Sequence, residues 1–173
     1  MQLVCFELRG QELALPIGDV RETLPIQPIP RVVLTPPCLA GVFSLRGDIV
    51  PVIDLAILLG MPRTEHLGGS LSAAPAGGRG PGLDPSRIVV TQHEGQPIGI
   101  IVEALRDLRT IDGPLEPPPA NLPPAVAALL AGIVSTPTGS VRVLDPAAIF
   151  AVDALRALAL VPGARSLERG PAA

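Results

Sequence analysis

The chain has 173 residues, of which 47% are hydrophobic and 17% charged, and its formal net charge is −3. This length and apolar content allow one domain with a substantial core, or two small halves packed together, without help from a metal. The net negative charge and the scattered basic residues, all of them arginine, argue against nucleic-acid binding, which needs a clustered positive face. With no Tyr or Trp and three Phe, the chain also lacks the aromatic surface typical of base-stacking and carbohydrate sites.

The first residues run directly into an apolar segment without a basic stretch or a small-residue cleavage site, so no signal peptide is expected. No apolar run reaches about 18 residues, the length that a membrane-spanning helix needs. Cys5 and Cys38 have apolar neighbours and no metal or disulfide spacing, which predicts two buried free thiols. We therefore expect a cytoplasmic protein with no cofactor, no metal and no insertion into the membrane.

Twenty-two prolines and eighteen glycines divide the sequence into short segments, as expected for a β-rich fold with many turns. In chain order, the expected strands are Leu3–Leu8, Glu12–Pro16, Leu39–Leu45, Ile49–Leu55, Arg87–Gln92, Pro97–Val102, Leu105–Ile111, Leu130–Ser135 and Ser140–Leu144. Tight hairpin turns are expected at Gly10, Gly47 and Gly95, where glycine supplies a positive φ. Short helical segments are expected at Ile17–Leu24, Pro124–Leu130 and Pro146–Leu160.

Two segments have the composition of unpacked chain. His66–Pro85 is rich in Gly, Pro, Ala and Ser, which predicts a flexible linker over residues 64–85. Residues 161–173 have a similar composition, which predicts a disordered tail. We therefore expect a single domain over residues 1–160, with a first half of about 1–63 and a second half of about 86–160.

An internal repeat relates these two halves. Leu39–Ser44 (LAGVFS) recurs as Leu130–Ser135 (LAGIVS). At the same spacing, Val52–Asp54 (VID) recurs as Val143–Asp145 (VLD). Self-similarity of this kind indicates a repeated structural unit.

The repeat continues upstream of these segments. Gly10 and Gly95 each stand before Gln and a strand, and Val20 and Leu105 follow them at equal distances. A unit of about 60 residues would bury too little surface to be stable alone. The repeat therefore predicts two similar small β-barrels around a shared core, with an element exchanged between them.

Catalysis finds little support in the sequence. His66 and His93 have no nucleophile or carboxylate partner at a recognisable spacing, so both are interpreted as exposed loop residues. Asp54 and Asp145 each follow an apolar strand, and their matched positions favour N-caps of short helices over a catalytic pair. The alternative function left open is a small β-barrel hydrolase or ligand-binding protein that uses Asp48 or Asp54. Small barrels also leave strand edges and apolar grooves that partner strands or helices can bind, which favours an interaction module.

Gly41–Gly60 (GVFSLRGDIVPVIDLAILLG) closely resembles the signature of CheW-like domains. In that signature a Leu-Arg-Gly hairpin separates two apolar strands, and an Asp-Leu pair follows. The resemblance extends from about Leu3 to Leu160. In the second half, Gly99–Glu103 and Leu105–Leu108 also look like the family pattern.

This resemblance implies two intertwined five-stranded SH3-like β-barrels around a shared hydrophobic core, with short helices. It also implies a non-catalytic adaptor of a bacterial chemosensory complex. Such an adaptor would couple the cytoplasmic tip of chemoreceptors (methyl-accepting chemotaxis proteins) to the regulatory domain of a CheA-type histidine kinase.

By matched position, the resemblance implies partner-binding roles for Val20, Glu22, Arg46, Gly99, Leu105 and Leu108. Arg46 and Glu22 would form an ion pair near the receptor-binding groove. As an exposed pair it would contribute roughly 0–1 kcal/mol, whereas arginine at a hairpin tip also suits contact with a partner. The three apolar residues would line the groove or else belong to the core. Gly99 would permit a close backbone approach.

Overall fold

The computed structural model describes residues 1–33, 35–63, 86–137, 139–153 and 155–156. The expected linker, His66–Pro85, and the expected tail, 161–173, lie outside the described residues. No helix in the described ranges combines the length and apolar character needed to cross a membrane.

The described residues are mainly β. Before residue 64 the strands are β1 (Gln2–Leu8), β2 (Gln11–Pro16), β3 (Val20–Pro25), β4 (Leu39–Leu45) and β5 (Asp48–Ile53). After residue 85 they are β6 (Arg87–His93), β7 (Gln96–Val102), β8 (Ala104–Thr110), β9 (Leu130–Thr136) and β10 (Gly139–Leu144). The helices are short: a 3₁₀ turn, η1 (Ile17–Asp19), and α1 (Leu55–Leu58), α2 (Pro124–Ala127) and α3 (Pro146–Phe150).

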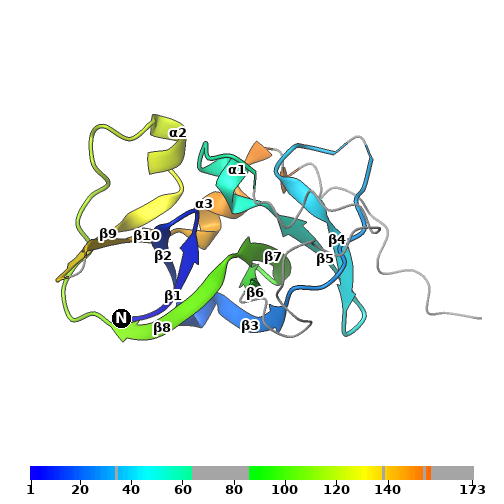
Figure 1. Ribbon diagram of the computed structural model, residues 1–173, viewed down its shortest axis with the longest axis horizontal. Coiled ribbons are helices and arrows are strands. Elements are labelled where there is room, and N and C mark those ends of the chain that lie inside the picture. The colour runs from blue at the N-terminus through cyan, green and yellow to red at the C-terminus, as the bar shows by residue number, and fades with distance from the viewer. Residues whose placement is uncertain (34, 64–85, 138, 154, 157–173) are drawn as a thin grey trace, which may run out of the picture.

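The strands form two five-stranded sheets, and each sheet contains strands from both halves of the chain. Barrel A has the order β8-β1-β2-β10-β9, and barrel B has the order β3-β6-β7-β5-β4. The barrels lie at opposite ends of the molecule, with α1 and α3 between them (Figure 1). The hairpin β1–β2 of the first half thus belongs to barrel A, whose other strands come from the second half. The hairpin β6–β7 of the second half belongs to barrel B, whose other strands come from the first half. The predicted fold class, with an exchanged element, is confirmed.

The sheet registers follow the sequence repeat. Val52 on β5 pairs in parallel with Gly99 on β7, and Val143 on β10 pairs in parallel with Ala14 on β2. These two parallel ladders join the exchanged hairpins to their barrels. Gly99 and Ala14 therefore occupy equivalent places, one in each barrel.

The core has three parts. The largest lies between the barrels and takes residues from both halves, among them Phe6, Leu13, Leu55, Ile100 and Leu144. The interior of barrel B contains Phe43, Val50, Val52, Ile88, Val90 and Ile101. The interior of barrel A contains Leu3, Cys5, Ala14, Val141 and Val143. Both cysteines are buried free thiols, as predicted.

Three two-residue hairpin turns have positive φ at both positions. The pairs are Arg9 and Gly10, Arg46 and Gly47, and Glu94 and Gly95. Positive φ at both positions defines the type I′ turn, whose twist matches that of the flanking strands. The glycines of these turns were predicted, but the positive φ of the charged residue before each glycine was not.

Two expectations were wrong. Ile17–Leu24 is not a helix: only η1 is helical, and Val20–Pro25 pairs with β6 as strand β3. The half-buried residues of β3 alternate with exposed ones, which is the period of a strand. His93 is not an exposed loop residue, because it ends β6 and its ring lies 5.5 Å from that of Phe150.

The two predicted helix caps are confirmed. The Ala56 N–H donates to Asp54 Oδ1 at 3.2 Å, and the Ala147 N–H donates to Asp145 Oδ1 at 2.9 Å. Each carboxylate therefore satisfies a backbone donor in the first turn of α1 or α3.

Candidate functional site

Four charged side chains form a network between β3 and the tip of the β4–β5 hairpin of barrel B. Arg46 Nη2 lies 3.2 Å from Glu22 Oε2, and Arg21 Nη1 lies 3.3 Å from Asp48 Oδ2. Arg21 Nε also lies 4.0 Å from Glu22 Oε1. Arg21 and Glu22 belong to the edge strand β3, whereas Arg46 and Asp48 belong to the tip of the β4–β5 hairpin at the other edge. The network therefore closes barrel B with ion pairs between its two edges.

The ion pair of this network is asymmetric in exposure. The Glu22 side chain is 17% exposed, whereas the Arg46 side chain is 70% exposed. Glu22 Oε1 is buried and has no hydrogen-bond partner in the described part of the chain. The largely buried Glu22 thus holds the Arg46 guanidinium by an ion pair, while most of the Arg46 side chain stays accessible to another molecule. The ion pair implied by the family resemblance is present, and its role in binding stays a prediction.

A β-bulge positions the apolar residues of the predicted site. In β8, Leu105 pairs with Phe6 and Leu108 pairs with Val4, so one extra residue is inserted. Because Phe6 and Val4 point to the same side of β1, the bulge gives Leu105 and Leu108 a common face.

The three apolar residues of the predicted site differ in exposure, and their role in binding stays a prediction. Val20 and Leu105 are partly buried against the shared core, and they occupy equivalent positions of the repeat. Leu108 is 67% exposed. Val20 and Leu105 therefore pack against the shared core, whereas Leu108 is an exposed apolar side chain.

Gly99 does not reach the surface. It is buried in β7, where an added Cβ would lie 2.9 Å from Ile88 Cγ2 and 3.2 Å from Val52 Cγ2. Both distances are too short for an ordinary contact, so the absence of a side chain allows the sheet to pack. An effect of Gly99 on a partner would be transmitted through the barrel interior.

Asp48 and Asp54, the candidates for the alternative hydrolase, do not form a catalytic pair. Asp48 begins β5 and pairs with Arg21, whereas Asp54 follows the other end of the same strand. Asp54 is fully buried and caps α1. Asp54 therefore has a structural role as a helix cap and is not a nucleophile or base.

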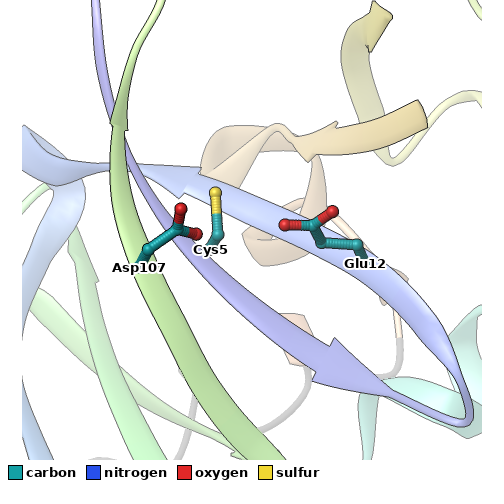
Figure 2. Close-up of side chains that lie close together, drawn as sticks. All are labelled: Cys5, Glu12 and Asp107. Atoms are coloured by element: carbon teal, nitrogen blue, oxygen red, sulfur yellow. The ribbon is translucent and has the colours of Figure 1, made fainter. Parts of the chain in front are cut away.

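One cluster was not anticipated from the sequence. Cys5 Sγ and carboxylate oxygens of Glu12 and Asp107 lie within 4.8 Å of one another, and Figure 2 shows the two carboxylates on either side of the thiol. Arg109 Nη2 lies 3.0 Å from Glu12 Oε1 and 3.4 Å from Asp107 Oδ1. The guanidinium already balances these carboxylates, so we assign no metal to them. Burial raises the pKa of the Cys5 thiol to about 11, with a smaller opposing effect of Arg109.

This cluster lies beside a pocket of about 680 Å³ that is lined by the β1–β2 hairpin and β8 of barrel A. Its lining includes Glu7, Glu12, Leu105, Arg106, Asp107 and Arg109. The lining residues come from the β1–β2 hairpin and from β8, which is distant from it in sequence, so local patterns could not reveal the pocket. The repeat was the available signal, because Arg106 and Asp107 follow Gly95 at the distances at which Arg21 and Glu22 follow Gly10.

Comparison with known proteins supports the resemblance seen in the sequence. A family model described as the CheW-like domain matches residues 2–154. A probable chemotaxis protein CheW of Rhizobium etli is 29% identical over 123 residues, which make up 68% of this chain and 66% of that protein. Chemotaxis protein CheW of Bacillus subtilis is 24% identical over 150 residues, or 86% of each chain.

A solved structure shares the fold. The crystal structure of scaffolding protein TtCheW from Thermoanaerobacter tengcongensis matches with a TM-score of 0.70 and 29% identity, and the match covers 88% of this chain and 89% of that one. The chain spans just under two thirds of the Rhizobium etli relative and most of the Bacillus subtilis one. Because the family model covers nearly all of the described residues and the paired barrels recur in the solved structure, the chain belongs to the CheW-like family.

Proposed function

We propose that this chain is a non-catalytic, cytoplasmic adaptor that couples chemoreceptors to a CheA-type histidine kinase. Its partners would be the cytoplasmic tip of a methyl-accepting chemotaxis protein and the regulatory domain of the kinase. The observation that carries the proposal is the Arg46–Glu22 pair, in which a mostly exposed arginine side chain at a hairpin tip is held by a largely buried carboxylate.

The chemistry of the surface supports a protein partner. Arginine at a fixed position offers a planar set of donors for carboxylate and carbonyl groups, and it is frequent among residues that dominate interface energies. Val20, Leu105 and Leu108 provide apolar surface on which an amphipathic helix could lay its apolar face. Glu22 holds the arginine in place, and Gly99 keeps the interior of barrel B closely packed beneath it.

The test compares two arginines that share one turn geometry. Arg46 and Arg9 each occupy the first position of a type I′ turn, with φ of 53° and 52°. Asparagine tolerates this conformation, so Arg46→Asn and Arg9→Asn remove a guanidinium and keep the turn. Binding to an immobilised receptor tip and to the kinase regulatory domain would be measured for both variants, with melting curves alongside.

Arg46→Asn should weaken receptor-dependent assembly by about 1–3 kcal/mol, as expected for an interface arginine, whereas Arg9→Asn should leave it unchanged. Arg46→Lys should restore little binding, because lysine keeps the charge without the planar fork. Equal binding by a folded Arg46→Asn protein would remove Arg46 from the interface. If the wild-type chain bound neither partner, the adaptor proposal itself would fail.

A further inference from the structure

The charged network of barrel B has an incomplete counterpart in barrel A. Arg106 and Asp107 on β8 are the repeat equivalents of Arg21 and Glu22 on β3, at the 85-residue spacing that also relates Gly10 to Gly95. Each pair lies at a β-bulge, and the two bulges occupy equivalent positions in β8 and β3. Both barrels therefore present an arginine followed by an acidic residue at the corresponding edge.

The hairpin tips opposite these dipeptides differ. In barrel B the tip carries Arg46 and Asp48, which contact Glu22 and Arg21. At the 91-residue spacing of the second part of the repeat, barrel A has Pro137 in place of Arg46 and Gly139 in place of Asp48. Proline and glycine have no side-chain donor or acceptor, so this tip cannot close barrel A with ion pairs.

Because of this difference, the two side chains of the barrel A dipeptide are more exposed than their equivalents in barrel B. The side chain of Asp107 is 55% exposed, whereas that of its equivalent Glu22 is 17% exposed. Arg106 is 55% exposed, whereas Arg21 is 30% exposed. The dipeptide of barrel A also borders the pocket of about 680 Å³, so a segment of another molecule can reach it.

Partners within barrel A satisfy this dipeptide only in part. Arg106 pairs with Glu7, and Asp107 accepts from Arg109 Nη2 at 3.4 Å, near the long limit of a hydrogen bond. The guanidinium of Arg106 has further donors, and the exposed carboxylate of Asp107 has further acceptor positions.

We propose that the Arg106–Asp107 edge of barrel A binds a hairpin or turn of a partner protein that carries a basic and an acidic residue two positions apart. The template is the chain's own Arg46-Gly47-Asp48, which meets the equivalent dipeptide with crossed ion pairs. The basic residue of the partner would contact Asp107, and its acidic residue would contact Arg106. Leu105 also lines the pocket and provides apolar surface beside them.

A foreign partner fits better than a second copy of this chain. The Arg46 and Asp48 side chains of each copy are already engaged with Glu22 and Arg21. Docking of this tip on another copy would break these two ion pairs to form two new ones, with no net gain. A partner whose tip is free of such contacts has no such cost.

The probe for the test is a cyclic hairpin peptide with the sequence of residues 44–49, Ser-Leu-Arg-Gly-Asp-Ile. It would be titrated into the full isotope-labelled chain, and amide shifts would be followed by NMR at low and high salt. Saturable shifts are expected in β8 around Arg106 and Asp107 and in the β1–β2 hairpin. Asp107→Asn and Arg106→Gln should each weaken binding about tenfold or more, and added salt should weaken binding to the wild type.

Three controls keep the test decisive. A peptide with Ala in place of its Arg and Asp should not bind, and Glu94→Gln, a change at an exposed turn of the other exchanged hairpin, should leave binding unchanged. Pro137→Arg places a cation on the tip of barrel A, so it should compete with the peptide for Asp107 and weaken peptide binding. This variant tests the site without a change to Arg106 or Asp107. Absence of saturable shifts, shifts confined to Arg21 and Glu22, or binding that the Asp107 and Arg106 variants leave unchanged would each overturn the proposal. Self-association of the wild type that Asp107→Asn abolishes would assign the site to a second copy instead.

Discussion

Arg46 is held in a backbone conformation that most residues avoid. Its φ of 53° lies in the left-handed region, where a side chain with a Cβ costs roughly 1–2 kcal/mol. The type I′ turn requires this conformation at both central positions, and Asn or Gly would satisfy it with less strain. Arginine at this position therefore carries a cost to the fold, which an ion pair of roughly 0–1 kcal/mol offsets only in part.

This strain separates two substitutions that would otherwise look alike. Arg46→Ala loses the ion pair and keeps the strain, whereas Arg46→Asn loses the same pair and relieves the strain. We expect the Asn variant to be more stable than the Ala variant by about 0.5–1 kcal/mol in urea denaturation. Equal stability of the two variants would show that the turn tolerates alanine and that strain plays no part.

The cysteines give the chain an unusual response to alkali. Burial raises the pKa of Cys5 from 9.0 to about 11 and raises that of Cys38 as well. The chain has no Tyr and no Lys, and arginine stays protonated in this range, so the two thiols dominate the titration between pH 9 and 11.

The sign of the pH effect follows from the raised pKa values. Below about pH 8 the thiols are protonated in both the folded and the unfolded state, so they do not lower stability there. Between about pH 9 and 11 the unfolded chain releases protons that the folded chain retains, so the free energy of unfolding falls as pH rises. For Cys5 the loss should be on the order of 2 kcal/mol, and Cys5→Ala should remove that share when urea unfolding is compared at pH 8 and 10.5. A Cys5→Ala protein with the wild-type pH profile would contradict the assignment.

At the scale of elements, sequence periodicity predicted most strands but not β3. Val20–Pro25 is an edge strand with a bulge at Arg21, and its half-buried face mixes Glu22 with Val20 and Leu24. Such a segment has too few apolar residues for a clear strand pattern. Its repeat equivalent was correctly predicted as a strand, so alignment of the two halves would have corrected the error.

The candidate site was also predicted only in part, because local sequence patterns reveal some of its residues and contacts between distant strands bring in the others. Arg46 and Glu22 were identified through a family signature, and the ion pair between them is present. The cluster of Cys5, Glu12 and Asp107 was not predicted, because three strands contribute to it. Two of them, β1 and β8, come from different halves of the chain and pair only in the folded barrel. Local sequence patterns carry no record of such a contact, and the repeat was the signal available for the Asp107 edge.

Gly99 offers a test of packing within one element, with its repeat equivalent as a guide. An added Cβ would crowd Ile88 and Val52, whereas Ala14 is accommodated in barrel A beside Leu3, the equivalent of Ile88. Leucine lacks the Cγ2 branch that lies 2.9 Å from the added atom. Gly99→Ala should therefore cost about 1–3 kcal/mol of unfolding free energy, and Ile88→Leu in the same chain should recover part of it.

Denaturation of the two single variants and the double variant measures this coupling directly. Additive losses would mean that Ile88 is not the limiting neighbour. Partner binding by Gly99→Ala should change only as far as stability does, since the residue is buried.

At the scale of the whole molecule, neither half of the chain can complete a barrel alone. Barrel A takes β1 and β2 from the first half and β8, β9 and β10 from the second, and barrel B has the reverse composition. The core between the barrels likewise contains Phe6 and Leu55 from one half and Ile100 and Leu144 from the other. Separation of the halves would expose this core and leave unpaired edges on every incomplete sheet.

The halves should therefore fold only together. Fragments of residues 1–63 and 86–160, expressed separately, should each show little cooperative unfolding, because each lacks the partner strands of its hairpins. On mixing, they should form a one-to-one complex with native circular dichroism, at a midpoint that rises with concentration, since association replaces an intramolecular step. A second fragment with Ile100→Asp, which places a charge in the shared core, should fail to complement the first. Cooperative unfolding of either fragment alone would show that one half contains a complete folding unit and that the exchanged hairpins are not required for it.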